Sequence, residues 1–186
     1  MVCKTVTATR FECAQSGITL METMVVVSIL AMLTGMALPS FKEMILNHRL
    51  RGKAFEYVTH MNWARSLAVS SNQAVNLRIS ASESTFCYVV FHGPGDDCNC
   101  NASGAVCSTA GNNLLVVVLS RSERIRVSAR TESAATRINP RQGMISPTLT
   151  AIFSADSGKS IHNISNILGR TRSCTPDESN FGLPAC

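Results

Sequence analysis

One long apolar segment near the amino terminus limits what this chain can fold into. Residues 18–38 are almost entirely apolar, which is enough for a helix to cross the hydrocarbon core of a bilayer. A single carboxylate, Glu22, interrupts the segment close to its start. A charged side chain inside a membrane costs roughly 2.5–3.5 kcal/mol on insertion scales, so it indicates a functional role. The alternative is a shallow glutamate that reaches the lipid headgroups.

Three residues occupy distinctive positions in and around this segment. Gly17 precedes it, Glu22 is the fifth residue after that glycine, and Pro39 follows its end. This arrangement resembles the class III signal of type IV pilins and pseudopilins. The resemblance implies that a prepilin peptidase cleaves between Gly17 and Ile18, that Ile18 is then methylated, and that Glu22 pairs with the terminal amine of a neighbouring subunit. Residues 1–17 would be the leader, and Pro39 would kink the helix.

The helix is expected to continue beyond the apolar segment. Apolar residues recur there at three- and four-residue spacing, which is typical of one buried face of a helix. The expected face consists of Phe41, Met44, Ile45, Ala54, Phe55, Val58, Met61, Ala64, Leu67 and Ala68. A polar cluster at residues 70–72 marks the end. We therefore predict a transmembrane and filament-core helix over residues 18–39 and an amphipathic continuation over residues 40–72.

After residue 72 the hydrophobic period changes from helical to two, which indicates strands. Strands are predicted over residues 75–79, 85–91, 114–119, 123–128, 149–154, 159–164 and 164–168, with a hairpin turn at Gly158. Residues 92–111 are predicted to be a long loop, and residues 131–143 to be irregular. The sequence thus predicts an α+β fold, in which the long helix packs on an antiparallel β head over residues 73–174. Residues 175–186 would be a tail held only by its cysteine.

Six cysteines follow the leader, an even number that is typical of disulfides in an exported domain. They are Cys87, Cys98, Cys100, Cys107, Cys174 and Cys186. Counting does not fix their connectivity. Cys174 with Cys186 is the favoured pair, because it would close the tail into a ring. The cluster of Cys98, Cys100 and Cys107 could instead bind zinc, although Cys-x-Cys is shorter than the usual ligand spacing.

Positive charge is concentrated in the C-terminal part of the chain. The formal net charge is +5, and it falls to +4 without residues 1–17, which hold Lys4, Arg10 and Glu12. Six basic and six acidic residues balance between residues 18 and 120, whereas nine basic residues accompany five acidic ones from Arg121 onward. This excess favours a polyanionic partner, although it also serves solubility.

A second motif, Gly169-Arg170-Thr171-Arg172, lies within this basic region. Two arginines one residue apart project from the same face of an extended segment, and each planar guanidinium group donates two hydrogen bonds to one phosphate. The glycine would let the backbone approach the ligand. The alternative is a turn glycine followed by two solvated arginines. Lys159, Arg141 and Arg137 are weaker candidates for an accessory patch. Four other arginines are interpreted as solvent-facing residues of a strand and its flank: Arg121, Arg124, Arg126 and Arg130.

Together with the processing signal, the Trp63-Ala64-Arg65-Ser66-Leu67-Ala68 stretch and the terminal cysteines, this motif resembles the FimT/GspH branch of minor pseudopilins. In FimT-like members a Gly-Arg-x-Arg is associated with DNA binding during natural transformation. The resemblance implies a minor type IV pilin that assembles with other pilins and contacts double-stranded DNA through Arg170 and Arg172. It also implies an inner-membrane protein with a periplasmic head, which becomes extracellular in the pilus.

Two other functions fit the same residues. One is a structural minor pseudopilin, at a pilus tip or in a type II secretion pseudopilus, that starts assembly and binds no DNA. The other is an adhesin that presents the cysteine-rich loop on a pilin stem. An enzyme is not predicted, because the chain has no phosphate-binding loop, His-Glu-x-x-His or Gly-x-Ser-x-Gly motif. No cofactor is predicted either, and we assign structural roles to His48, His60, His92 and His162.

Overall fold

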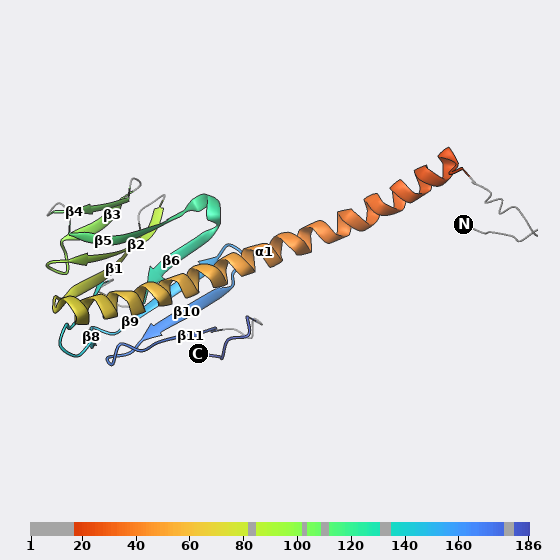
Figure 1. Cartoon of the computed structure of the whole chain (residues 1–186). Coiled ribbons are helices and arrows are strands. Elements are labelled where there is room, and N and C mark those ends of the chain that lie inside the picture. Colours follow the sequence, from red (N-terminus) through yellow and green to blue (C-terminus); the bar gives the residue numbers. More distant parts are fainter. Residues whose placement is uncertain (1–16, 82–84, 102–103, 109–111, 131–134, 177–180) are drawn as a thin grey trace, which may run out of the picture. The chain divides into compact units, whose positions relative to one another are not determined.

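The computed structural model describes residues 17–81, 85–101, 104–108, 112–130, 135–176 and 181–186, with the backbone alone for residues 36–39 and 100–101 (Figure 1). The leader expected over residues 1–17 therefore lies outside the described residues, apart from Gly17. The chain divides into two compact units, Met1–Lys42 and Glu43–Cys186. The membrane segment belongs to the first unit and the predicted head to the second.

A single helix, α1 (Leu20–Ser71), continues past Pro39 and has 52 residues. By its length and composition it can span a membrane. Its first turn is capped by Thr19, whose Oγ1 accepts a hydrogen bond of 3.2 Å from the Glu22 backbone N–H. Apolar side chains of the first unit remain exposed, as at Ile18 (75%) and Met21 (75%). Apolar surface of this extent requires lipid or other protein to cover it.

Two antiparallel sheets make up most of the Glu43–Cys186 unit. The first has the strand order β5-β2-β1-β7-β8. Its strands are β1 (Val75–Ala81), β2 (Thr85–His92), β5 (Asn113–Ser120), β7 (Ala135–Ile138) and β8 (Ile145–Ser146). The second has the order β11-β10-β9-β6. Its strands are β6 (Ile125–Ala129), β9 (Leu149–Ala155), β10 (Ser160–Ser165) and β11 (Thr171–Cys174). A separate hairpin joins β3 (Cys98–Asn101) to β4 (Gly104–Cys107), and a short 3-10 helix, η1 (Arg121–Glu123), precedes β6.

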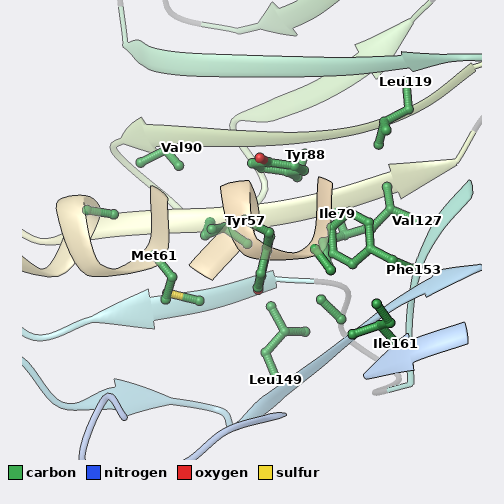
Figure 2. Close-up of a cluster of buried hydrophobic side chains, with 14 of the residues drawn as sticks. Tyr57, Met61, Ile79, Tyr88, Val90, Leu119, Val127, Leu149, Phe153 and Ile161 are labelled. Carbon is green, nitrogen blue, oxygen red and sulfur yellow. The ribbon is translucent and has the colours of Figure 1, made fainter. Parts of the chain in front are cut away.

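The hydrophobic core lies between α1 and the two sheets (Figure 2). At its centre the Tyr57 ring of α1 contacts Tyr88 of β2 edge-on, with centroids 5.3 Å apart, and Phe153 of β9 at 5.6 Å. Each aromatic side chain of this kind removes about 150–250 Å² from water. Every buried hydrophobic residue among those described lies within Glu43–Cys186. We therefore expect this unit to fold without the residues before it.

The predicted buried face of the helix is partly wrong. The residues of α1 that are buried in the core are Leu46, Leu50, Ala54, Tyr57, Met61, Ala64 and Ala68. The predicted face shares four of these residues, but Phe41, Met44 and Phe55 are exposed. Two apolar stripes run side by side along α1, and spacing alone does not say which of them the sheets cover. The covered stripe includes Tyr57. Because its side chain carries a polar hydroxyl group, the apolar pattern did not include it in the predicted buried face.

Several strand boundaries also differ from the predictions. The predicted loop over residues 92–111 contains β3 and β4, which its glycine- and asparagine-rich composition concealed. The predicted irregular stretch over residues 131–143 contains β7, which pairs with β1. The predicted strand over residues 164–168 is wrong after Ser165, because a turn follows and β11 begins at Thr171. The hairpin of β9 and β10 is confirmed, with Gly158 in its turn at φ 83°.

The C-terminal tail is held by more than its cysteine. Thr175 and Ala185 form a parallel bridge, with hydrogen bonds from the Thr175 N–H to the Pro184 carbonyl and from the Cys186 N–H to the Thr175 carbonyl, both 3.0 Å. Phe181 is 8% exposed and belongs to the core. The expectation of a tail anchored only by its disulfide is therefore wrong, because one aromatic side chain and a backbone pairing also fix it.

Candidate nucleic-acid interface

The Gly-Arg-Thr-Arg motif spans the turn between β10 and β11 and the first two residues of β11. Three short hydrogen bonds fix this turn. The Gly169 N–H donates to the Asn166 carbonyl at 2.9 Å, the Arg170 N–H to Asn166 Oδ1 at 2.9 Å, and the Asn166 N–H to the Arg170 carbonyl at 3.1 Å. Asn166 thus organises the turn with both its backbone and its side chain, as asparagine commonly does.

Gly169 is required by the chain's own packing. It has φ 78°, a left-handed conformation that favours glycine. A Cβ at this position would lie 2.5 Å from the Gly143 carbonyl oxygen and 2.9 Å from Nε of Arg65. Arg65 extends from α1 and donates from Nε to that same carbonyl at 3.0 Å. A ligand was the expected neighbour of this glycine, but the close approach that Gly169 permits is to Gly143 and Arg65.

Both arginines of the motif are exposed. Arg172 lies opposite Ile164 of β10. Its neighbours Thr171 and Ser173 face the other way, because Thr171 bonds with Ser165 at 2.8 Å and Ser173 donates to Asn163 Oδ1 at 2.7 Å. Alternation therefore directs Arg172 to the outer face of the four-stranded sheet. Within the described part of the chain, no carboxylate pairs with Arg170 or Arg172.

Two further arginines share this outer face. Arg130 follows β6, and its backbone N–H donates to the Thr150 carbonyl at 3.1 Å. Because Thr150 pairs with Ile164, and Ile164 with Arg172, both arginines belong to one row across the sheet. Three inter-strand steps separate their backbones by about 14 Å. Arg126 also faces outward, but it donates to Asp156 at 2.7 Å, and this hydrogen bond lowers the pKa of Asp156.

The weaker candidates of the sequence analysis are scattered. Lys159 lies in the turn between β9 and β10, at the other end of β10 from Gly169, and its Nζ is 2.8 Å from Glu43 Oε1. Arg137 is exposed on β7 of the five-stranded sheet. Arg141 lies in the turn over residues 139–143, next to the Gly143 that touches Gly169. The structure therefore brings Arg141 close to the motif and leaves Lys159 and Arg137 apart from it.

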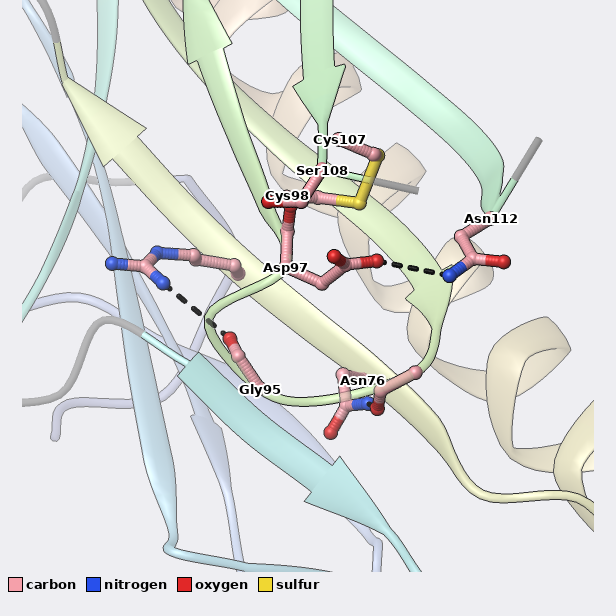
Figure 3. Close-up of a disulfide and its surroundings, with 9 residues drawn as sticks. Asn76, Gly95, Asp97, Cys98, Cys107, Ser108 and Asn112 are labelled. Carbon is pink, nitrogen blue, oxygen red and sulfur yellow. Dashed lines mark hydrogen bonds between the residues drawn. A yellow bond between two sulfur atoms is a disulfide. The ribbon is translucent and has the colours of Figure 1, made fainter. Parts of the chain in front are cut away.

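The cysteine pairs that the structure describes are Cys174–Cys186 and Cys98–Cys107. The first is the pair that the sequence favoured. The second joins directly opposed residues of β3 and β4, near an Asp97–Asn112 hydrogen bond of 2.9 Å (Figure 3). Since Cys98 and Cys107 bond to each other, neither is available to a zinc ion. Cys87 is also disulfide-bonded, and the Cys100 side chain lies outside the described residues.

The residues expected to act in processing and assembly lie at the start of α1. Gly17 and Ile18 precede the helix and are exposed. Glu22 is the third residue of α1, three residues after the capping Thr19. Thr-x-x-Glu at a helix start is the capping-box pattern, in which the glutamate supports the helix end. Glu22 thus has a local structural role available to it besides the pairing with another subunit.

The fold can now be compared with known proteins. A long amino-terminal helix packed on antiparallel sheets is the architecture of a pilin. A family model described as type II transport protein GspH matches residues 54–166. This match covers more than half of the chain, so the chain belongs to the GspH family. It is therefore a minor pilin or pseudopilin of the FimT/GspH type, a class of filament subunits rather than enzymes.

Two solved structures are similar to this chain. The type IV minor pilin FimU of Pseudomonas aeruginosa is 13% identical, with a TM-score of 0.50 over 67% of this chain and 87% of FimU. The minor pseudopilin EpsH of the Vibrio cholerae type 2 secretion system is 13% identical, with a TM-score of 0.45 over 69% and 98%. No curated protein matches the chain. The family match includes neither Glu22 nor Gly169–Arg172, so it leaves the roles of these residues to experiment.

Proposed function

We propose that this minor pilin assembles into a type IV pilus and binds double-stranded DNA through Arg170 and Arg172, in support of DNA uptake. The observation that carries the proposal is a pair of exposed arginines without carboxylate partners among the described residues, on a turn held by three hydrogen bonds and by the contact of Gly169 with Gly143. A rigid turn loses little conformational freedom when it binds, so more of the electrostatic attraction remains as affinity.

The chemistry favours phosphates over bases. Guanidinium groups bind phosphate oxygens through two parallel hydrogen bonds and keep their charge at every physiological pH. Arg130 extends the same outer face and adds a third positive charge. Contacts to the phosphate backbone carry no sequence information, which suits a protein that takes up DNA of any sequence. Lys159 and Arg137 remain outside the proposed contact, because Glu43 neutralises the first and the second belongs to another sheet.

The test is DNA binding by the Glu43–Cys186 unit as a function of salt. Arg170→Gln and Arg172→Gln should each weaken binding to a random duplex by roughly tenfold at about 0.1 M salt, and each should lower the salt slope by about one. Fluorescence anisotropy with a labelled duplex measures both quantities. Arg49→Gln removes an exposed arginine of α1 and serves as the matched control, with no expected change. Equal affinity of wild type and both variants would refute DNA binding by the motif.

A structural role without DNA is the second candidate, and the family supports it directly. The chain is similar to both a subunit of a type IV pilus and a pseudopilin of a type 2 secretion system, so both filaments are candidates for its assembly. In this case the wild-type head would show no DNA binding even at low salt. The neighbouring genes distinguish the two machines. A subunit of the type IV pilus is expected beside pilus and competence genes, and a subunit of the type II secretion pseudopilus is expected beside secretion genes.

Assembly is proposed to require the carboxylate of Glu22, after cleavage between Gly17 and Ile18 and methylation of Ile18. Glu22→Gln retains an oxygen that can serve the capping box but removes the charge that would pair with a neighbouring terminal amine. We expect it to abolish incorporation into filaments while the protein still accumulates in the inner membrane. Immunoblotting of sheared pili against membranes measures this. Thr19→Ala is the control, which weakens the cap by about 1 kcal/mol and should leave incorporation intact.

A further inference from the structure

An open pocket lies between α1 and the turn over residues 139–143, whose Gly143 contacts Gly169 of the Gly-Arg-Thr-Arg motif. The pocket has a volume of about 590 Å³. One wall is the last turns of α1, from which Asn62, Arg65 and Ser66 line it. The other wall is the turn over residues 139–143, which contributes Arg141 and Gln142. Among the described residues, no carboxylate lines this pocket.

Both walls are held firmly. The turn over residues 139–143 closes through a hydrogen bond of 2.8 Å from the Gly143 N–H to the Asn139 carbonyl, and Asn139 Oδ1 accepts from the Arg141 N–H at 2.9 Å. Arg65 uses only its Nε–H to hold the Gly143 carbonyl, so its two Nη groups keep their N–H donors for a ligand. Arg141 has no ion pair within the part of the chain that the structure describes.

The electrostatics of the pocket select an anion. Two guanidinium groups line one open pocket, and no carboxylate stands among its described lining residues, so their mutual repulsion is relieved when an anion binds. The end of α1 acts against this, because a helix C-terminus carries about half a negative charge. Two full positive charges outweigh that half charge. The planar, divergent donors of arginine match a phosphate oxygen pair better than they match a spherical ion.

We propose that this pocket, formed by Arg65 and Arg141, binds a second phosphate of the DNA that Arg170 and Arg172 hold. The inference rests on the proposed function and extends it. Gly143 touches Gly169, so the backbones of Arg141 and Arg170 are at most about 17 Å apart along this path. This upper limit corresponds to at most about five base-pair steps along the DNA axis, at 3.4 Å each. One strand can therefore reach both sites, and Arg65 links them by holding Gly143 against Gly169.

The test compares Arg141→Gln with Arg170→Gln in the Glu43–Cys186 unit, using a random duplex of about 20 base pairs. Arg141→Gln should weaken binding by roughly tenfold at about 0.1 M salt and reduce the salt slope by about one, and the double variant should reduce the slope by about two. Arg49→Gln should match wild type. A parallel titration with inorganic pyrophosphate should shift the Nε–H resonance of Arg65 in wild type, with the shift lost in Arg141→Gln.

The outcomes separate the inference from the proposed function. If Arg170→Gln weakens DNA binding but Arg141→Gln matches wild type, the pocket takes no DNA phosphate and the inference is overturned, while the proposed function stands. If wild type binds no DNA, the proposed function fails. The pyrophosphate titration then tests by itself whether the pocket binds phosphate. A saturable shift of Arg65 would then support a phosphate site for another polyanion, whereas no shift would overturn the site altogether.

Discussion

Gly169→Ala is expected to destabilise the Glu43–Cys186 unit by about 2–5 kcal/mol and to weaken DNA binding about as much as the loss of Arg170. The left-handed conformation at φ 78° costs an alanine about 1–2 kcal/mol. The new Cβ would also lie 2.5 Å from the Gly143 carbonyl oxygen, which is backbone and cannot rotate away. Relief of such a contact typically adds 1–3 kcal/mol, and it would displace the turn that carries the arginines.

Gly158→Ala is the matched control for this prediction. Gly158 also lies in a hairpin turn, at φ 83°, but a Cβ there would meet nothing within 4 Å. This variant should cost only the conformational part, about 1–2 kcal/mol, and leave DNA binding unchanged. Urea denaturation measures the stabilities, and an unchanged m-value would establish that both variants unfold as wild type does. An equal loss of unfolding free energy in Gly169→Ala and Gly158→Ala would show that the contact with the Gly143 carbonyl does not add to the destabilisation.

Phe153→Ala is expected to lower the free energy of unfolding of the same unit by about 3–5 kcal/mol. Phe153 is fully buried between α1 and the four-stranded sheet, where its ring lies 5.6 Å from that of Tyr57. Its removal leaves a cavity that α1 and the sheets cannot close without moving apart, because the remaining core residues are tightly packed. The melting temperature should fall by about 10 °C, at roughly 2–4 °C per kcal/mol for a unit of this size.

Leu168→Ala provides the control for the core prediction. Leu168 is 66% exposed at the tip of the turn between β10 and β11, so its truncation should change stability by no more than about 0.5 kcal/mol. Thermal unfolding followed by circular dichroism compares the two variants. A loss of less than about 1 kcal/mol for Phe153→Ala would mean that the core does not depend on the packing of α1 against β9.

The sequence predicted the regular parts of this fold well. The long apolar segment and the stripe that follows it predicted α1, because a helix of that length leaves a strong periodic signal. The alternation of residues 149–154 and 159–164 predicted the hairpin of β9 and β10. The start of the turn at Asn166 escaped prediction, although Gly169 was expected to be a turn residue, because Ile167 and Leu168 are apolar yet exposed. Hydrophobicity alone placed them in a strand.

The sequence by itself determined the class of this protein. An apolar segment with Gly17 before it and Glu22 within it, and a change of hydrophobic period after residue 72, are local patterns, and they predict the helix and the strands directly. The tertiary structure alone decided how the basic residues group. Arg65 and Arg141 are far apart in the chain, and they line one pocket only because the turn over residues 139–143 packs against α1. The same packing holds Gly143 against Gly169 and leaves Lys159 with Glu43. Contacts between distant segments depend on the summed packing of the whole core, which no local pattern encodes.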